Sequence, residues 1–101
     1  MEPLRTQFDD RTFRYTQIER DGDMAIFSQT HKLGQVTRYE VVRIRVQPER
    51  AWPDGRITPE REAYPGSSTW GRDGFTCFSL LEAKALAQSL QTGQQEQRAE
   101  E

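Results

Sequence analysis

Cysteine and histidine are almost absent from this sequence. Cys77 is the one cysteine and His31 the one histidine among the 101 residues. One cysteine cannot form a disulfide within the chain, so we expect the protein to work in a reducing compartment, the cytoplasm. A zinc site needs three or four ligands, drawn mostly from these residue types, and the two lie far apart in the chain. We therefore expect neither a metal nor another cofactor.

Long hydrophobic runs are missing as well. No apolar run approaches the ~18 residues of a membrane-spanning helix, and Met1–Arg5 lacks the basic-then-apolar pattern of a secretory leader. Apolar residues make up 34% of the chain and charged residues 30%, which predicts that part of it lies outside the core. The net charge of −2 argues against a protein that coats duplex nucleic acid, because such proteins carry an excess of Lys and Arg.

Motifs of known catalytic sites are also lacking. The sequence contains neither a Gly-x-Ser-x-Gly nucleophile elbow nor a Gly-rich loop ending in Gly-Lys-Ser/Thr. Cys77, between Phe75 and Phe78, is expected to be a small buried hydrophobic residue rather than a nucleophile. His31 lies in a predicted turn, where a lone histidine is usually solvated. We therefore expect that the protein is not an enzyme.

Alternating apolar residues predict four β-strands. In the first, at 12–20, Phe13 and Tyr15 share one parity and Ile18 has the other, which predicts a bulge or a twist. Asp21-Gly22 is a strong turn signal, and it leads into a second strand at 24–30.

The third predicted strand, at 36–46, has the clearest alternation. Val42, Ile44 and Val46 share one face, which is expected to be the inner one. The opposite face, expected to be in solvent, carries Tyr39, Val41, Arg43 and Arg45. A short fourth strand is expected at 74–78.

A C-terminal helix follows the fourth strand. Ser79 and Glu82 have the spacing of a capping box, and Gly93 stands where a helix-ending glycine is expected. The apolar stripe consists of Leu80, Ala83, Leu86, Ala87 and Leu90. The sequence therefore predicts an α+β fold, in which a four-stranded antiparallel β-meander packs on one C-terminal α-helix.

Composition also divides the chain into segments. Residues 1–11 are mostly polar and are predicted to be a flexible N-terminal lead-in, and 92–101 are predicted to be a disordered tail. Residues 12–91 are expected to form a single domain, with a long loop at 47–73 that is rich in Pro and Gly. Large aromatic side chains such as Trp52 favour partial order in that loop.

The segment 64–76 reads Tyr-Pro-Gly-Ser-Ser-Thr-Trp-Gly-Arg-Asp-Gly-Phe-Thr and precedes the predicted Leu/Ala helix. It resembles small uncharacterised proteins of bacteria and their phages, which have a strand meander, a Tyr-Pro-x-Ser…Trp-Gly…Gly-Phe-Thr loop and a C-terminal helix. The resemblance covers about residues 13–90 and implies that fold, but no activity and no catalytic residue. At the level of architecture alone, four strands and a helix also resemble single-strand-binding domains of the transcriptional-coactivator and Whirly type.

Two functions remain open. The first is a non-enzymatic interaction domain that binds a protein partner or self-associates, because aromatic residues and Arg commonly anchor interfaces. The second is a single-stranded nucleic-acid-binding domain that uses the outer sheet face, where rings and positive charge would combine. The residues expected at the partner or nucleic-acid surface are Tyr39, Arg43, Arg45, Trp52 and Tyr64.

Overall fold

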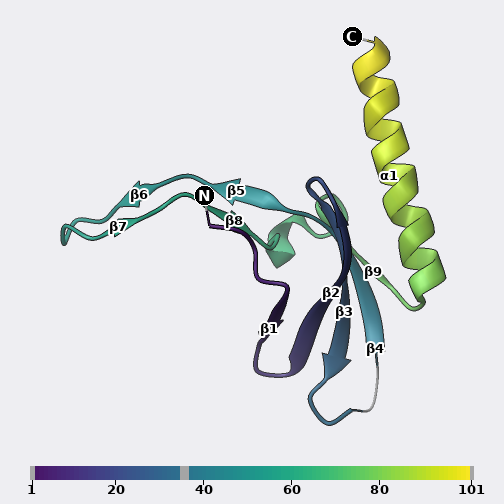
Figure 1. The fold of residues 1–101 in the computed structure, drawn as a ribbon, viewed down its shortest axis with the longest axis horizontal. Coiled ribbons are helices and arrows are strands. Elements are labelled where there is room, and N and C mark those ends of the chain that lie inside the picture. Colours follow the sequence, from purple (N-terminus) through teal and green to yellow (C-terminus); the bar gives the residue numbers. More distant parts are fainter. Residues whose placement is uncertain (1, 35–36, 101) are drawn as a thin grey trace.

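The computed structural model describes residues 2–34 and 37–100, and its centre is an antiparallel β-sheet with one helix packed on it (Figure 1). The strand order is β1-β2-β3-β4-β9. The strands are β1 (Gln7–Asp9), β2 (Phe13–Asp21), β3 (Met24–His31), β4 (Thr37–Arg43) and β9 (Gly74–Cys77), and the helix is α1 (Leu80–Glu100). The predicted α+β class, with an antiparallel sheet and a C-terminal helix, is confirmed.

The sheet has one strand more than the sequence predicts. β1 lies within the expected N-terminal lead-in and pairs antiparallel with β2, with Phe8 opposite Tyr15. The two rings stack with their centroids 4.9 Å apart. A single aromatic residue in a polar stretch therefore gives this segment enough apolar contact to join the sheet edge.

The β2–β3 hairpin follows the sequence prediction closely. Gly22 adopts a positive φ of 63° in the turn, a conformation that glycine reaches without steric cost. The pairing register shifts between Gln17 and Glu19, so Ile18 is the extra residue of a β-bulge. The break in apolar parity at Ile18 thus reports a real irregularity in the strand.

The expected solvent-facing side of β4 is not in solvent. Val41 and Val42 are both fully buried, on opposite faces of the strand. The face carrying Tyr39 and Val41 packs against α1, and the face carrying Val42 packs against a second apolar cluster. The division into one dry and one wet face is therefore wrong, because the helix covers the face that was expected to be wet. Val36, the expected first residue of this strand, lies outside the described residues.

The helix begins as predicted. The Glu82 amide donates to Ser79 Oγ over 3.1 Å, which is the N-cap half of the capping box. The predicted apolar stripe packs on Met24, Ile26, Val41 and Cys77 of the sheet. α1 continues beyond Gly93 to Glu100, through residues expected in the tail. Within the described residues, no helix combines the length and the apolar character needed to cross a membrane.

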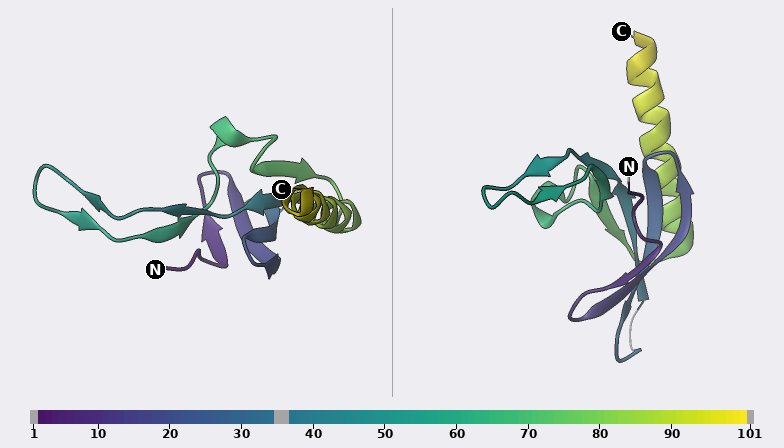
Figure 2. Two further views of the ribbon diagram at one scale, coloured as in Figure 1. Left: turned by 90° about the horizontal axis from the view of Figure 1, so that it is seen from above. Right: turned by 60° about the vertical axis from the view of Figure 1, so that its left-hand side comes forward.

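Most of the predicted long loop forms a two-stranded projection, called here the β-arm (residues 45–63). β5 (Arg45–Gln47) pairs with β8 (Arg61–Ala63), and farther out β6 (Arg50–Ala51) pairs with β7 (Ile57–Thr58). Figures 1 and 2 show the β-arm extending away from the sheet. The chain then returns through the short 3-10 helix η1 (Ser67–Thr69) to β9.

Candidate functional site

The residues expected on one basic and aromatic surface do not lie together. Tyr39 packs against the cluster beneath α1. Arg43 is half-buried, and its Nε is buried without a hydrogen-bond partner. Arg45 is exposed at the base of the β-arm, 3.7 Å from Asp73 Oδ2. Trp52 lies far out on the β-arm, and Tyr64 packs on the sheet face opposite α1. These five side chains therefore do not form one surface.

Two arginines of the β-arm lie over the Trp52 ring. The guanidinium carbon of Arg50 lies 3.9 Å from the Trp52 ring centroid, and that of Arg56 lies 5.9 Å away. The indole Nε1 donates to Thr58 Oγ1 over 2.9 Å. Alternation along β6 and β7 places these four side chains on one face of the β-arm.

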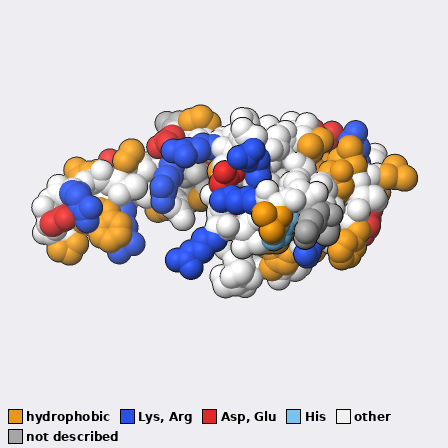
Figure 3. Space-filling model, turned by 90° about the horizontal axis from the view of Figure 1, so that it is seen from below, with side chains coloured by type: hydrophobic (Ala, Val, Ile, Leu, Met, Phe, Trp, Pro, Cys, Tyr) orange, Lys and Arg blue, Asp and Glu red, His pale blue; other side chains and the backbone are white. Residues whose placement is uncertain are grey.

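A groove of about 560 Å³ runs beside this Arg–Trp–Arg stack. Its walls include Pro48, Arg50, Trp52, Pro59 and Arg61. Figure 3 shows hydrophobic and basic side chains side by side at the outer end of the β-arm. The groove therefore combines an aromatic wall with two arginines and one acid, Glu49.

Tyr64 belongs to a different cluster, formed by aromatic rings on the sheet face opposite α1. In most pairs of this cluster the ring centroids lie within 6 Å of each other; the rings are those of Phe8, Tyr15, Phe27 and Tyr64. Phe27 and Tyr64 meet edge to face, with their centroids 5.3 Å apart. Edge-to-face and offset contacts of this kind stabilise aromatic clusters beyond their buried area.

A buried carboxylate lies among these rings. Glu40 is only 6% exposed, and it accepts hydrogen bonds from Tyr64 Oη at 2.5 Å and from Gln29 Nε2 at 3.4 Å. Gln29 Nε2 also donates to Tyr15 Oη, and that hydroxyl donates to Asp10 Oδ2 over 3.1 Å. Burial raises the pKa of Glu40 above its ordinary value, although the Tyr64 hydrogen bond acts in the opposite direction. Burial likewise raises the pKa of the Tyr64 hydroxyl.

The rings and the carboxylates line a cavity of about 430 Å³, called here the aromatic pocket. Trp70 forms one of its walls, and its Nε1 donates to Thr76 Oγ1 over 3.1 Å. The Trp70 ring lies directly over Gly74, where any Cβ atom would overlap it. The main members of the pocket are Phe8, Asp10, Tyr15, Glu40, Tyr64 and Trp70.

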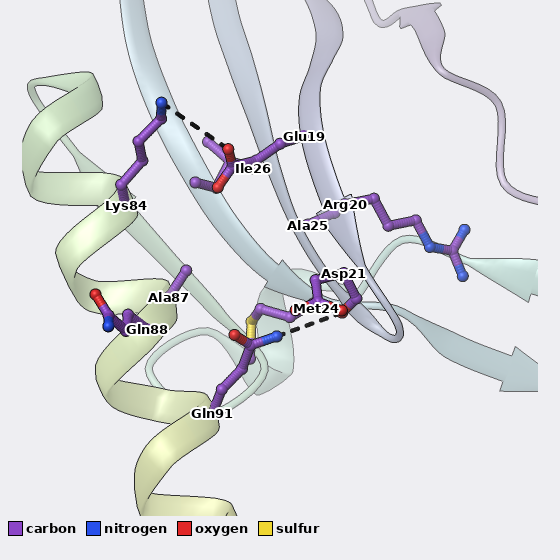
Figure 4. A pocket seen from close by; sticks show the side chains of 10 residues that line it. All are labelled: Glu19, Arg20, Asp21, Met24, Ala25, Ile26, Lys84, Ala87, Gln88 and Gln91. Atoms are coloured by element: carbon purple, nitrogen blue, oxygen red, sulfur yellow. Dashed lines mark hydrogen bonds and ion pairs between the residues drawn. The ribbon is translucent and has the colours of Figure 1, made fainter.

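A cleft of about 370 Å³ lies between α1 and the end of the β2–β3 hairpin (Figure 4). Lys84 Nζ lies 4.0 Å from Glu19 Oε2, and Gln91 Nε2 donates to the Asp21 carbonyl oxygen over 3.4 Å. These contacts join the helix to the hairpin beside the buried Met24. Both contacts hold α1 against the hairpin.

Sequence reasoning missed the aromatic pocket apart from Tyr64. One signal was present: Glu40 has the same parity in β4 as Val42 and Ile44, so a carboxylate stands on an apolar face. Phe8, Tyr15 and Trp70 gave no such signal, because they come from three segments that only the folded chain brings together.

The comparisons with known proteins add no assignment to this geometry. The resemblance of residues 64–76 to bacterial and phage proteins therefore stays a prediction. No family model matches the chain, and neither the curated proteins nor the solved structures include a significant match.

Proposed function

We propose that this chain is a non-enzymatic interaction domain that contacts a protein partner through the β-arm. The observation that carries the proposal is the Arg50–Trp52–Arg56 stack, presented on a projection outside the main sheet. Tryptophan and arginine are the residues most enriched where interfaces gain their binding energy. A two-stranded ribbon is marginally stable alone in water, so a partner that covers it also stabilises it.

Side chains, rather than strand edges, make the proposed contact. Pro48, Pro53 and Pro59 interrupt the β-arm, and proline has no backbone N–H to donate to an added strand. The groove beside Trp52 offers an aromatic surface flanked by Arg50 and Arg61. It suits a protein segment that brings an apolar side chain together with a carboxylate.

Charge favours a protein over a nucleic acid. The β-arm carries four arginines, at 45, 50, 56 and 61, and four acids, at 49, 54, 60 and 62. Single-stranded nucleic acid is nevertheless a second candidate, because guanidinium groups contact phosphates and their planes can also stack on bases. That alternative places the contact on the β-arm instead of the sheet face. In either case we place the protein in the cytoplasm, on the basis of its single, buried cysteine.

The experiment compares the wild-type chain with Trp52→Ala and with a matched exposed-residue control, Leu33→Ala. Purified protein is first examined by sedimentation equilibrium over a range of concentrations, which detects self-association. Complexes isolated from the native cell are then reconstituted from purified components, and labelled single-stranded DNA and RNA are titrated in parallel.

We expect a reconstituted protein complex that Trp52→Ala weakens by at least tenfold, or ~1.4 kcal/mol, and that the control leaves unchanged. Binding of single strands that depends on Trp52, with no protein complex, would favour the second candidate. A complex insensitive to Trp52→Ala would contradict the assignment to the β-arm.

A further inference from the structure

We propose that the aromatic pocket binds an organic cation, a quaternary or protonated alkylammonium group, between its aromatic rings and its two carboxylates. The pocket lies on the main sheet and is formed by residues outside the β-arm, so this inference does not depend on the function proposed above. The ligand class follows from the walls, the charge and the size of the pocket.

The walls are the first argument. Phe8, Tyr15, Tyr64 and Trp70 all line the cavity. Aromatic faces carry negative partial charge and attract cations, and cages of several rings are a recurrent way to bind quaternary ammonium groups. The cavity of about 430 Å³ also falls within the usual range for small-molecule sites.

The charge of the pocket is the second argument. Its two ionisable carboxyl groups are Asp10 and Glu40, and no Lys or Arg lines it. Among the described residues, neither carboxylate forms an ion pair within 4.0 Å. A carboxylate as buried as Glu40 is costly without a counter-charge. A bound ammonium group would supply that charge, whereas an anion would be repelled.

The hydrogen bonds are the third argument. Tyr64 and Tyr15 direct their hydroxyl groups to Glu40 and Asp10, and Gln29 links the two halves of the network. The hydroxyls are thereby engaged with the carboxylates, and both rings are held in fixed orientations. Preorganised rings lose little conformational entropy when a ligand enters.

A metal ion fits this pocket poorly. The pocket supplies only two carboxylates, and among the described residues no three His, Cys, Asp or Glu side chains are grouped to hold an ion. An apolar aromatic wall also offers nothing to a small hard cation. The chemistry therefore points to an organic cation.

The test uses the two tryptophans of the chain, one in the pocket and one on the β-arm. Choline is titrated into the ¹⁵N-labelled full-length protein while the indole N–H signals are followed by NMR. Trp52→Phe assigns the signals. We expect a saturable shift of the Trp70 signal, with the Trp52 signal unmoved.

A neutral isostere provides the first control. 3,3-Dimethylbutan-1-ol has the shape of choline without its charge, and we expect it to bind at least about tenfold more weakly, consistent with the loss of cation–π and carboxylate attraction. This comparison needs no variant and stands even if a pocket mutant fails to fold. Equal binding of the two compounds, or no saturable shift with choline, would overturn the proposal.

A charge-removing variant provides the second control. Glu40→Gln keeps an oxygen that accepts from Tyr64 but removes the negative charge, and we expect choline affinity to fall about tenfold. Glu49→Gln removes one exposed charge from the β-arm and should leave the affinity unchanged. A folded Glu40→Gln protein with wild-type affinity would contradict the proposed role of the carboxylate.

The ammonium group can belong to a free small molecule or to a side chain of another protein. Acetylated and amidated lysine and trimethyllysine, titrated alongside choline, distinguish these sources. Tighter binding of the lysine derivatives would identify a protein side chain as the ligand, and tighter binding of choline would identify a free small-molecule cation.

Discussion

At the scale of single residues, Trp70 takes its place in the pocket because residue 74 is glycine. A Cβ atom there would overlap the six-membered part of the Trp70 ring. We expect Gly74→Ala to lower the free energy of unfolding by ~1–3 kcal/mol, as forced repacking does elsewhere, and to shift the Trp70 signals. Urea unfolding measures the change.

Gly66→Ala is the matched control for this substitution. Gly66 has a φ of −78°, which any residue adopts, and no atom lies within 4 Å of the place that a Cβ atom would occupy. The stability of this variant should stay within ~0.5 kcal/mol of wild type. Equal stability of the two variants would mean that the Trp70 ring has room to move.

Glu62 is the residue that links stability most directly to pH. Arg20 Nη2 lies 2.5 Å from Glu62 Oε2, and the Leu4 amide donates to Oε1 over 2.9 Å. The pairing with Arg20 is the main cause that lowers the pKa of Glu62 from 4.5 to about 2. In Figure 4 the Arg20 side chain points away from the helix cleft. The pair instead joins the β2–β3 hairpin to β8.

The sign of the pH effect follows from this lowered pKa. The Glu62 carboxyl group loses its proton more readily in the folded state than in the unfolded state. Its ionised form therefore stabilises the fold above about pH 4.5, and this stabilisation is lost as the pH falls towards about 2. We expect Glu62→Gln to flatten the stability profile in that window, measured by urea unfolding at several pH values. Glu60→Gln, at an exposed neighbouring position, should retain the wild-type slope.

At the scale of elements, the helix start illustrates how local signals act. Ser79→Ala removes the acceptor of the Glu82 amide, and we expect a loss of ~1 kcal/mol in the free energy of unfolding. Ser89→Ala is the matched control, since Ser89 is exposed in the helix interior and alanine has the higher helix propensity. A control variant that loses as much stability as Ser79→Ala would show that the cap contributes little.

The strands were predictable to different degrees. β2, β3 and β9 follow from alternation and turn residues, and the bulge at Ile18 follows from its parity. β1 has one apolar residue, Phe8, and becomes a strand by pairing with β2 while that ring packs on Tyr15, Phe27 and Tyr64. The short strand pairs of the β-arm were not predicted, because prolines and glycines surround them and these residues are also typical of irregular loops.

At the scale of the whole molecule, the described core contacts of α1 extend as far as Leu90. Leu90 is the last residue that packs on the cluster beneath α1, and Gln91 makes the last hydrogen bond to the hairpin among the side-chain contacts described. We expect a chain ending at Gln91 to retain a single cooperative unfolding transition, with a change of at most ~1 kcal/mol, measured by circular dichroism during urea unfolding. Truncation before Leu86 serves as the opposing control and should abolish the transition. Loss of cooperativity in the longer chain would mean that residues 92–101 contribute to the folded core.

The sequence by itself determined the class of the fold, the β2–β3 turn, the bulge and the helix with its cap and apolar stripe. These features depend on neighbours within a few positions, which a linear pattern records. Only the tertiary structure decided that both faces of β4 are buried, because that depends on where α1 and residues 64–70 pack. The aromatic pocket is also a tertiary feature: Phe8, Glu40 and Trp70 are distant in sequence, and folding alone brings their side chains around one cavity.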